Sequence, residues 1–381
     1  GLWLRWDDDQ LAGLGDALKE CPSAPLSGIP QITISRCLVY DSSSHFAATY
    51  TPFTPEFSFG ARSPAELEEW QTAFRPRLRQ ILGLDNLAAD LAGHQPSAEL
   101  RATEDMGDYI RESWHIWVEP TVPLPFYLLR PLAVNEPVPL VIIPHGHNHP
   151  HIYVGIARTD KEAVEIAEGE RDIGVQAVRE GYIAIAPTTR AFGETRTEKD
   201  RAADKIHSCQ IQLRHGLLAG RTPIGERVWD MGCLIDWACA TQPVDPGRIA
   251  MTGNSGGGTV TVFASACDTR IALAMPGCYF CTFAGSIGSI NHCDCNYVPG
   301  ILRLGEMYDV AGLIAPRPFN AISGRTDPIF PIDQVELAYG KLREVYAVAG
   351  VEEQCRLYIG DGGHRYYKDG AWPFVREFFT R

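Results

Sequence analysis

The sequence predicts an α/β fold with a mostly parallel central sheet and helices on both of its faces. From about residue 138 onward, short apolar runs alternate with segments of helical periodicity. Several of these runs are apolar at successive positions, as in a strand buried inside a sheet. Strands separated by helices pair in parallel, because each helix returns the chain to the edge where the previous strand began.

Composition places the chain among globular proteins with a large core. It has 381 residues, of which 45% are hydrophobic and 21% charged. The net charge of −13 and the lack of a basic run argue against a nucleic-acid partner, and no apolar stretch is long enough to span a membrane. Eleven cysteines dispersed over a long chain do not resemble a disulfide framework. We therefore expect a cytoplasmic protein, although the initial glycine leaves a removed leader open; the oligomeric state is not predicted.

The first hundred residues are expected to pack on the main domain. Residues 1 to about 60 have no sustained period and predict an extended arm. Ser63, followed by Pro64 and by apolar residues at helical spacing up to Leu82, predicts a capped helix on the outside of the core. We therefore assign residues 1–104 to an arm with its helix and 105–381 to the main domain.

The main domain opens with a predicted antiparallel hairpin and a buried strand. Residues 109–118 and 124–130 form the hairpin, and 138–144 form the strand. The segments predicted after it are a helix at 173–180, a strand at 182–186, a helix at 227–239, a strand and helix around 248–260, strands at 271–275 and 318–323, a helix at 333–348, a strand at 355–359 and a helix at 372–379. Lid-like insertions near 191–226 and 278–312 follow strand ends, where ligands bind in such sheets.

A Gly-x-Ser-x-Gly turn between a strand and a helix identifies Ser255 as the candidate nucleophile. The turn is Gly253-Asn254-Ser255-Gly256-Gly257, and small residues follow it. Glycines are needed at 253 and 257, because a side chain there would collide with a neighbouring strand or helix. The turn leaves the hydroxyl exposed at a helix N-terminus, where backbone N–H groups stabilise negative charge.

A serine nucleophile needs a base and a carboxylate that orients the base. The candidate base is His364, in the glycine-rich loop after the last strand. The candidate acid is Asp327, in a turn past the strand that precedes the final helix pair; Asp361 and Asp294 are its rivals. The chain order serine, acid, histidine is the one that accompanies a nucleophile turn of this kind.

The same chemistry requires two N–H donors for the developing oxyanion. We expect them from the backbone of Gly256 and of His147, which lies in the loop after the buried strand. Arg190, at the next strand end, is expected to hold its loop by hydrogen bonds to carbonyl groups or to contact substrate. The residues suggested as substrate contacts are His145, Arg190, Trp229 and Tyr279.

Two clusters suggest metal binding as an alternative. Histidines recur at alternate positions in residues 145–151, but their spacing matches no established ligand pattern. Cys278, Cys281, Cys293 and Cys295, together with His292, resemble a zinc clip of the form C-x-x-C followed by C-x-C. We expect free thiols or one disulfide in this second cluster. The sequence hypothesis therefore includes no metal and no cofactor.

With these residues in place, the chain resembles the α/β-hydrolase superfamily, and within it the acetyl xylan esterase-like and dienelactone hydrolase-like enzymes. The matching pieces are His145-Gly146-His147, Arg190, Gly253-Asn254-Ser255-Gly256-Gly257, Gly324-Arg325-Thr326-Asp327 and Gly363-His364. They cover roughly residues 105–381, and the cysteine-rich insertion looks like that of a bacterial subgroup of esterases. The resemblance implies a triad of Ser255, Asp327 and His364, with an oxyanion hole at His147 and Gly256.

The resulting hypothesis is a serine esterase, an acetyl esterase-like enzyme. It would deacetylate a small or carbohydrate-linked acyl ester through an acyl-enzyme. Three alternatives stay open: a serine peptidase or amidase with the same triad, a metal-dependent hydrolase that uses the histidine loop or the cysteine cluster, and a binding protein that retains the fold without activity.

Overall fold

The computed structural model describes residues 40–50 and 54–379 of the chain. The chain divides into two units, residues 1–54 and 55–381. In the first unit the structure describes a helix, α2 (Ser42–Tyr50), where the sequence predicted extended chain. The rest of the predicted arm up to residue 39 lies outside the described residues. The second unit holds the sheet and the candidate site.

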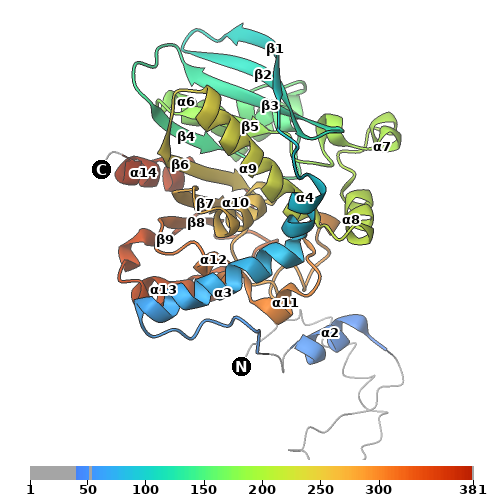
Figure 1. Ribbon diagram of the computed structural model, residues 1–381, viewed down its shortest axis with the longest axis vertical. Helices are drawn as coiled ribbons and strands as arrows, with labels where there is room; N and C mark the ends of the chain where they lie inside the picture. Colours follow the sequence, from blue (N-terminus) through green and yellow to red (C-terminus); the bar gives the residue numbers. More distant parts are fainter. Residues whose placement is uncertain (1–39, 51–53, 380–381) are drawn as a thin grey trace, which may run out of the picture. The chain divides into compact units, whose positions relative to one another are not determined.

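The second unit is built on a nine-stranded sheet with the order β1-β2-β3-β5-β4-β6-β7-β8-β9 (Figure 1). The strands are β1 (Ala98–Asp105), β2 (Tyr109–Glu119), β3 (Val122–Pro131), β4 (Val138–Ile142), β5 (Ile183–Pro187), β6 (Val244–Asn254), β7 (Leu273–Gly277), β8 (Phe319–Gly324) and β9 (Cys355–Gly360). Strands β4 to β9 pair in parallel, and β1, β2 and β3 extend the sheet in antiparallel pairs. The predicted mostly parallel sheet is confirmed, whereas β1 was not predicted, because it is largely exposed and lacks an apolar run.

Strand β4 lies inside the sheet although it contains a proline. Its register with β6 shifts between Val138 and Leu140, so Pro139 falls on the irregular step. Proline has no N–H to donate, and a shift at this position leaves the regular ladder of the strand to begin at Leu140. The fully buried residues that follow match the predicted apolar run.

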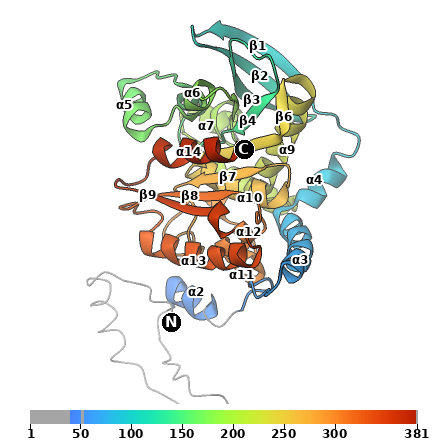
Figure 2. The ribbon, with the colours of Figure 1, turned by 90° about the vertical axis from the view of Figure 1, so that its left-hand side faces the viewer.

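Helices cover both faces of the sheet, as predicted (Figures 1 and 2). The helices longer than one turn in this unit are α3 (Pro64–Leu82), α4 (Leu84–Asp90), α5 (Asp160–Gly169), α6 (Ile173–Arg179), α7 (Glu198–Ala202), α8 (Cys209–Leu218), α9 (Pro223–Thr241), α10 (Gly256–Cys267), α12 (Met307–Gly312), α13 (Ile332–Val348) and α14 (Lys368–Phe379). Two buried apolar clusters result, one beneath α3, α9, α10, α12 and α13, and one beneath α6 and α14. Burial on both sides explains why the central strands are apolar throughout.

Helix starts follow the capping signals of the sequence. The side chain of Ser63 accepts a hydrogen bond from the N–H of Glu66, and Pro64 occupies the first turn of α3 as predicted. Helix α9 begins at Pro223, before the predicted start, because Thr222 caps it in the same way through the N–H of Gly225. Helix α9 packs on β2 and β6, whereas α3 packs on α9 and α10.

The two insertions contain short helices. The first holds the 3₁₀ turn η3 (Gly193–Thr195) with α7 and α8, and the second holds η4 (Asp294–Asn296), α11 (Ile301–Leu304) and α12. None of the helices within the described residues is both long and apolar enough to cross a membrane.

Candidate active site

Ser255 lies at the apex of a sharp turn between β6 and α10. Its backbone has φ 59° and ψ −118°, a conformation that residues with a side chain rarely adopt. The N–H of Ser255 donates to the carbonyl of Gly277 on the neighbouring strand, at 2.8 Å. Gly256 is the first residue of α10, so its N–H is one of those that have no partner within the helix. The turn therefore places a hydroxyl beside a helix N-terminus.

The two outer glycines of the turn are required by close backbone packing. A Cβ atom added to Gly253 would lie 2.2 Å from the carbonyl oxygen of Pro144, and one added to Gly257 would lie 2.0 Å from the same atom. Real carbon atoms do not approach an oxygen so closely. The loop after β4 and the turn after β6 are in contact at this point, which explains the glycines at both positions.

His364 and Asp327 are paired by a hydrogen bond. Nδ1 of His364 and Oδ2 of Asp327 lie 2.7 Å apart, and the Asp327 side chain is almost fully buried. The other carboxylate oxygen accepts hydrogen bonds from the N–H groups of Ile329 and Phe330. The rival Asp361 has a side chain that is 96% exposed and faces Arg325 instead. Among the predicted acids, Asp327 is thus the one that orients the imidazole.

The surroundings of Asp327 keep its carboxylate charged. Burial by itself would raise the pKa of Asp327, but the hydrogen bond and charge of His364, together with the two backbone N–H groups, hold that pKa below its usual value. The ring of Phe330 stacks on the imidazole of His364, with 5.9 Å between ring centroids. Asp327 therefore fixes one edge of the imidazole and Phe330 fixes one face, which leaves Nε2 as the free nitrogen.

A cavity of about 290 Å³ joins these groups. Its walls are formed by His147, Asn148, Arg171, Ser255, Gly256, Thr259, Ile290, Asn291, His292, Cys293, Asn296, Ile329, Phe330 and His364. The predicted nucleophile, the predicted base and both predicted oxyanion donors therefore border one space, and Asp327 lies behind His364. Their roles stay predictions, but the structure brings all five residues together.

His145 has a structural environment. It is buried beneath the cavity loop, where its Nε2 accepts a hydrogen bond from the N–H of Thr189 at 3.0 Å and its ring contacts Phe192. Burial lowers the pKa of His145 to about 3, so the ring is neutral at physiological pH. His145 joins the loop after β4 to the loop after β5 and is not among the residues that line the cavity.

Arg190 also lies outside the lining, and its partners differ from those predicted. The guanidinium binds carboxylates rather than the carbonyl groups expected from the sequence: Asp230 through two nitrogens at 2.6 and 2.9 Å, and Glu119 through a third. Glu226 lies 3.8 Å away. Because acidic side chains from β2 and α9 converge on it, Arg190 fastens the loop after β5 to these two elements.

Replacement of Arg190 by methionine is expected to cost stability rather than substrate affinity. Glu119 and Glu226 would keep Arg221 nearby, but the buried carboxylate of Asp230 would lose the guanidinium that pairs with it. An uncompensated buried charge of this kind lowers the free energy of unfolding by about 3–5 kcal/mol. Urea unfolding measures this loss, with Arg179→Met as control, because Arg179 pairs with Asp108 at the exposed surface and is expected to contribute less than about 1 kcal/mol. A variant of normal stability with a raised KM would instead favour contact with substrate.

Trp229 and Tyr279, the other two suggested substrate contacts, are part of the packing. Nε1 of Trp229 donates to the carbonyl of Val118 at 3.1 Å. Tyr279 is fully buried, and its ring packs edge-on against Phe330. Neither side chain lines the cavity.

Arg171 is a lining residue that the sequence analysis missed. It is largely buried, and its Nη2 donates to the backbone carbonyl of His364 at 3.2 Å. It precedes α6, in a segment without a motif, so only the three-dimensional contact with the His364 loop reveals it. It supplies a positive charge to the wall of the cavity.

The predicted cysteine cluster is not formed as expected. Cys278 lies beside Asp327 and the carbonyl of Arg365, and Cys281 lies near Met307. Cys293 and Cys295 are elsewhere, next to Cys209 and His147. Proximity in the sequence was misleading here, because Cys278 and Cys281 belong to two different buried clusters and Cys293 and Cys295 belong to a third. All four thiols are free.

The alternate histidines do not converge on one point either. His147 faces Cys295, whereas His149 and His151 stack on each other near Glu162. With His145 held by Thr189, the four rings serve three separate environments.

A family comparison is consistent with the fold described above. The sequence profile of the Abhydrolase family matches residues 46–284, more than half of the chain. The chain belongs to the Abhydrolase family. The α/β-hydrolase fold predicted from the motifs is thereby confirmed for this Abhydrolase protein, and the profile includes the turn at Ser255 and the loop that contains His147.

The individual proteins that this Abhydrolase protein resembles share a quarter of its residues or fewer. A Bacillus subtilis (strain 168) protein named "Putative hydrolase YtaP" is 25% identical over 290 residues, which are 74% of this chain and 91% of the relative. Among solved structures, a "putative acetyl xylan esterase" of Bacteroides fragilis superposes with a TM-score of 0.70 at 20% identity, covering 90% of this chain and 86% of the other. A glucuronoyl esterase of Teredinibacter turnerae gives 0.60 at 16% identity, covering 98% and 97%. These superpositions show a shared fold.

Proposed function

We propose that the protein is a serine carboxylic-ester hydrolase that acts through an acyl-enzyme. The observation that carries the proposal is the single cavity bordered by Ser255, Gly256 and His364, with Asp327 bonded to the far side of the imidazole. This set of groups is the minimum for acyl transfer: a nucleophile, a base, an orienting carboxylate and an oxyanion donor.

In the proposed reaction, Oγ of Ser255 attacks the ester carbonyl and Nε2 of His364 takes the hydroxyl proton. The imidazolium formed in this way lies 2.7 Å from the carboxylate of Asp327, which stabilises its charge. His364 then protonates the leaving alcohol, and water, activated by the same histidine, hydrolyses the acyl-enzyme.

The oxyanion is expected to bind where the loop after β4 meets α10. The N–H of Gly256 lies at the helix N-terminus, and a Cβ added to Gly256 would lie 3.3 Å from the ring of His147. The His147 loop is therefore in contact with the helix start, as a second backbone donor requires.

The substrate class proposed is a small or carbohydrate-linked acyl ester. The names of structural neighbours, an acetyl xylan esterase and glucuronoyl esterases, point to esters of sugars. The cavity lining also favours a substrate with a polar alcohol or sugar group, because asparagine and histidine side chains lie there beside Arg171 and can form hydrogen bonds with it.

A burst experiment with p-nitrophenyl acetate tests the proposal. At micromolar enzyme we expect rapid release of about one p-nitrophenol per active site, followed by slower turnover, because deacylation limits the rate of activated esters. The matching acetyl p-nitroanilide is expected to react far more slowly. Comparable turnover of the anilide would favour the amidase alternative, and no reaction with either compound would contradict the proposal.

A further inference from the structure

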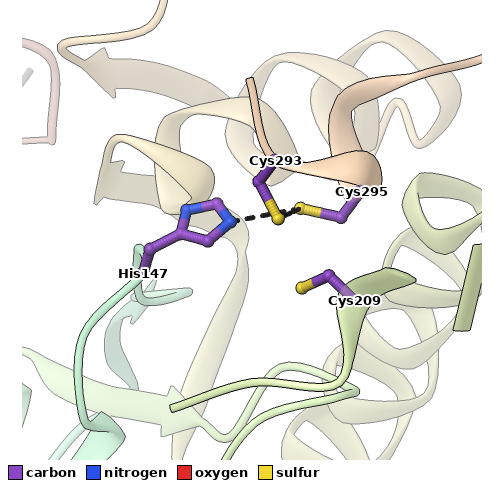
Figure 3. Close-up of side chains that lie close together, drawn as sticks. All are labelled: His147, Cys209, Cys293 and Cys295. Carbon is purple, nitrogen blue, oxygen red and sulfur yellow. Dashed lines mark hydrogen bonds between the residues drawn. The ribbon is translucent and has the colours of Figure 1, made fainter. Parts of the chain in front are cut away.

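Three cysteines and one histidine from distant parts of the chain converge beside the cavity. Cys209 is the first residue of α8 in the first insertion, and His147 lies in the loop after β4. In the second insertion, Cys293 directly precedes η4 and Cys295 lies within it. Figure 3 shows the ligand atoms of these four residues directed toward a common centre. We propose that this Cys₃His cluster binds one structural zinc ion.

The distances between the four atoms suit a tetrahedral ion. A zinc ion with Zn–S bonds of about 2.3 Å and a Zn–N bond of about 2.0 Å separates its sulfurs by about 3.8 Å and each sulfur from nitrogen by about 3.5 Å. Here Sγ of Cys293 and Sγ of Cys295 are 3.5 Å apart, and Sγ of Cys295 and Nε2 of His147 are 3.3 Å apart. All four atoms lie within 4.8 Å of one another.

The donor set selects the metal and its role. Thiolate and imidazole ligands in a tetrahedral arrangement suit zinc, and four protein ligands leave no open position for a reactive water. The zinc ion is therefore structural, which distinguishes it from the catalytic metal of a metal-dependent hydrolase.

A buried arginine supplies independent support. Arg227 is only 2% exposed, and its Nη2 lies 3.6 Å from Sγ of Cys209. Within the described part of the chain, no carboxylate lies within ion-pair distance of Arg227; its other hydrogen bonds go to the carbonyl of Arg190 and to Gln212. A buried cation without an anion is costly. Three thiolates and a neutral histidine around Zn²⁺ carry one net negative charge, which Arg227 neutralises.

The zinc ion would also fix the ring of His147. With zinc on Nε2, the ring proton must reside on Nδ1. That nitrogen lies on the side of Gly256, where an added Cβ would approach it to 3.3 Å. The ion thereby joins both insertions to the loop expected to donate to the oxyanion.

Metal analysis of the purified protein tests the site without any substrate. Protein prepared with reductant and without chelator is expected to contain about one zinc per chain. Cys209→Ser, which removes a ligand outside the cavity lining, is expected to contain less than about a tenth of that amount. The control Cys239→Ser alters an exposed thiol that is not part of the cluster and should retain the full amount.

Cobalt and heat provide two further readouts. Wild-type protein stripped of metal and reconstituted with Co²⁺ should develop an intense thiolate-to-cobalt absorption band that Cys209→Ser lacks. Chelation should lower the Tm of the wild type and of Cys239→Ser but leave that of Cys209→Ser unchanged, because binding of a metal to the folded state stabilises it.

Three results would overturn the zinc site. They are wild-type protein that takes up no stoichiometric zinc even after zinc is added, undiminished zinc in folded Cys209→Ser, and a disulfide among Cys209, Cys293 and Cys295 in peptide mapping. Because zinc content is independent of turnover, an inactive protein with stoichiometric zinc would contradict only the proposed esterase function.

Discussion

Replacement of Ser255 by alanine is expected to lower kcat for p-nitrophenyl acetate by about 10⁴- to 10⁶-fold, with His364→Ala causing a similar loss. In the proposed mechanism the two side chains act as one unit, since the hydroxyl is a weak nucleophile without the base and the base has no other group to activate. The double variant should therefore be hardly slower than either single variant. Steady-state and single-turnover rates measure these losses.

Ser265→Ala is the matched control for this prediction. Ser265 lies on the same helix, α10, but is fully buried, and within the described residues its hydroxyl has no hydrogen-bond partner. Its removal is expected to leave kcat within about twofold, because no interaction is lost. If Ser255→Ala retained wild-type turnover while Ser265→Ala lost it, Ser255 could not be the nucleophile.

Replacement of Gly257 by alanine is expected to destabilise the fold by more than about 4 kcal/mol. The added Cβ would lie 2.0 Å from the carbonyl oxygen of Pro144 and 2.9 Å from its carbon, both of them backbone atoms that cannot rotate away. The loop after β4 or the start of α10 must shift, and either shift displaces an expected oxyanion donor. Urea unfolding and the yield of soluble protein measure the effect.

Gly340→Ala separates this clash from the general effect of adding a methyl group. Gly340 lies inside α13, and an added Cβ would meet nothing within 4 Å. Alanine there is expected to stabilise the protein by about 0.5–1 kcal/mol, because a helix interior favours it over glycine. Equal stability of the Gly257→Ala variant and the wild type would show that the two loops are less tightly packed than the structure indicates.

The sequence predicted those elements whose signals are local. Short, largely apolar segments between helical patterns identified the parallel strands β4 to β9, and Ser63 with Pro64 identified the start of α3. Strand β1 was not predicted, because its exposed residues show no apolar periodicity. Helix α2 was not predicted either, because scattered prolines and serines suggested an extended chain there. Local patterns do not reveal a strand whose only support is pairing at the edge of a sheet.

The candidate site follows the same rule. Ser255, Asp327 and His364 could be proposed because each follows a predicted strand, and the ends of parallel strands meet at one edge of the sheet. Arg171 and the partners of Arg190 could not, since their contacts connect segments far apart in the chain. The cysteine grouping was wrong for the same reason: Cys209 is distant in sequence from Cys295 but lies beside it in space.

The proposed reacting groups and part of the cavity lining come from different segments of the chain, which bears on how the substrate range can evolve. The proposed reacting groups follow the ends of β6, β8 and β9, whereas residues 290–293 and 296 of the second insertion form another part of the cavity lining. That segment contributes no strand to the sheet. Descendants of this chain could therefore acquire new substrates by altering an insertion, while the inherited chemistry at the sheet edge stays intact.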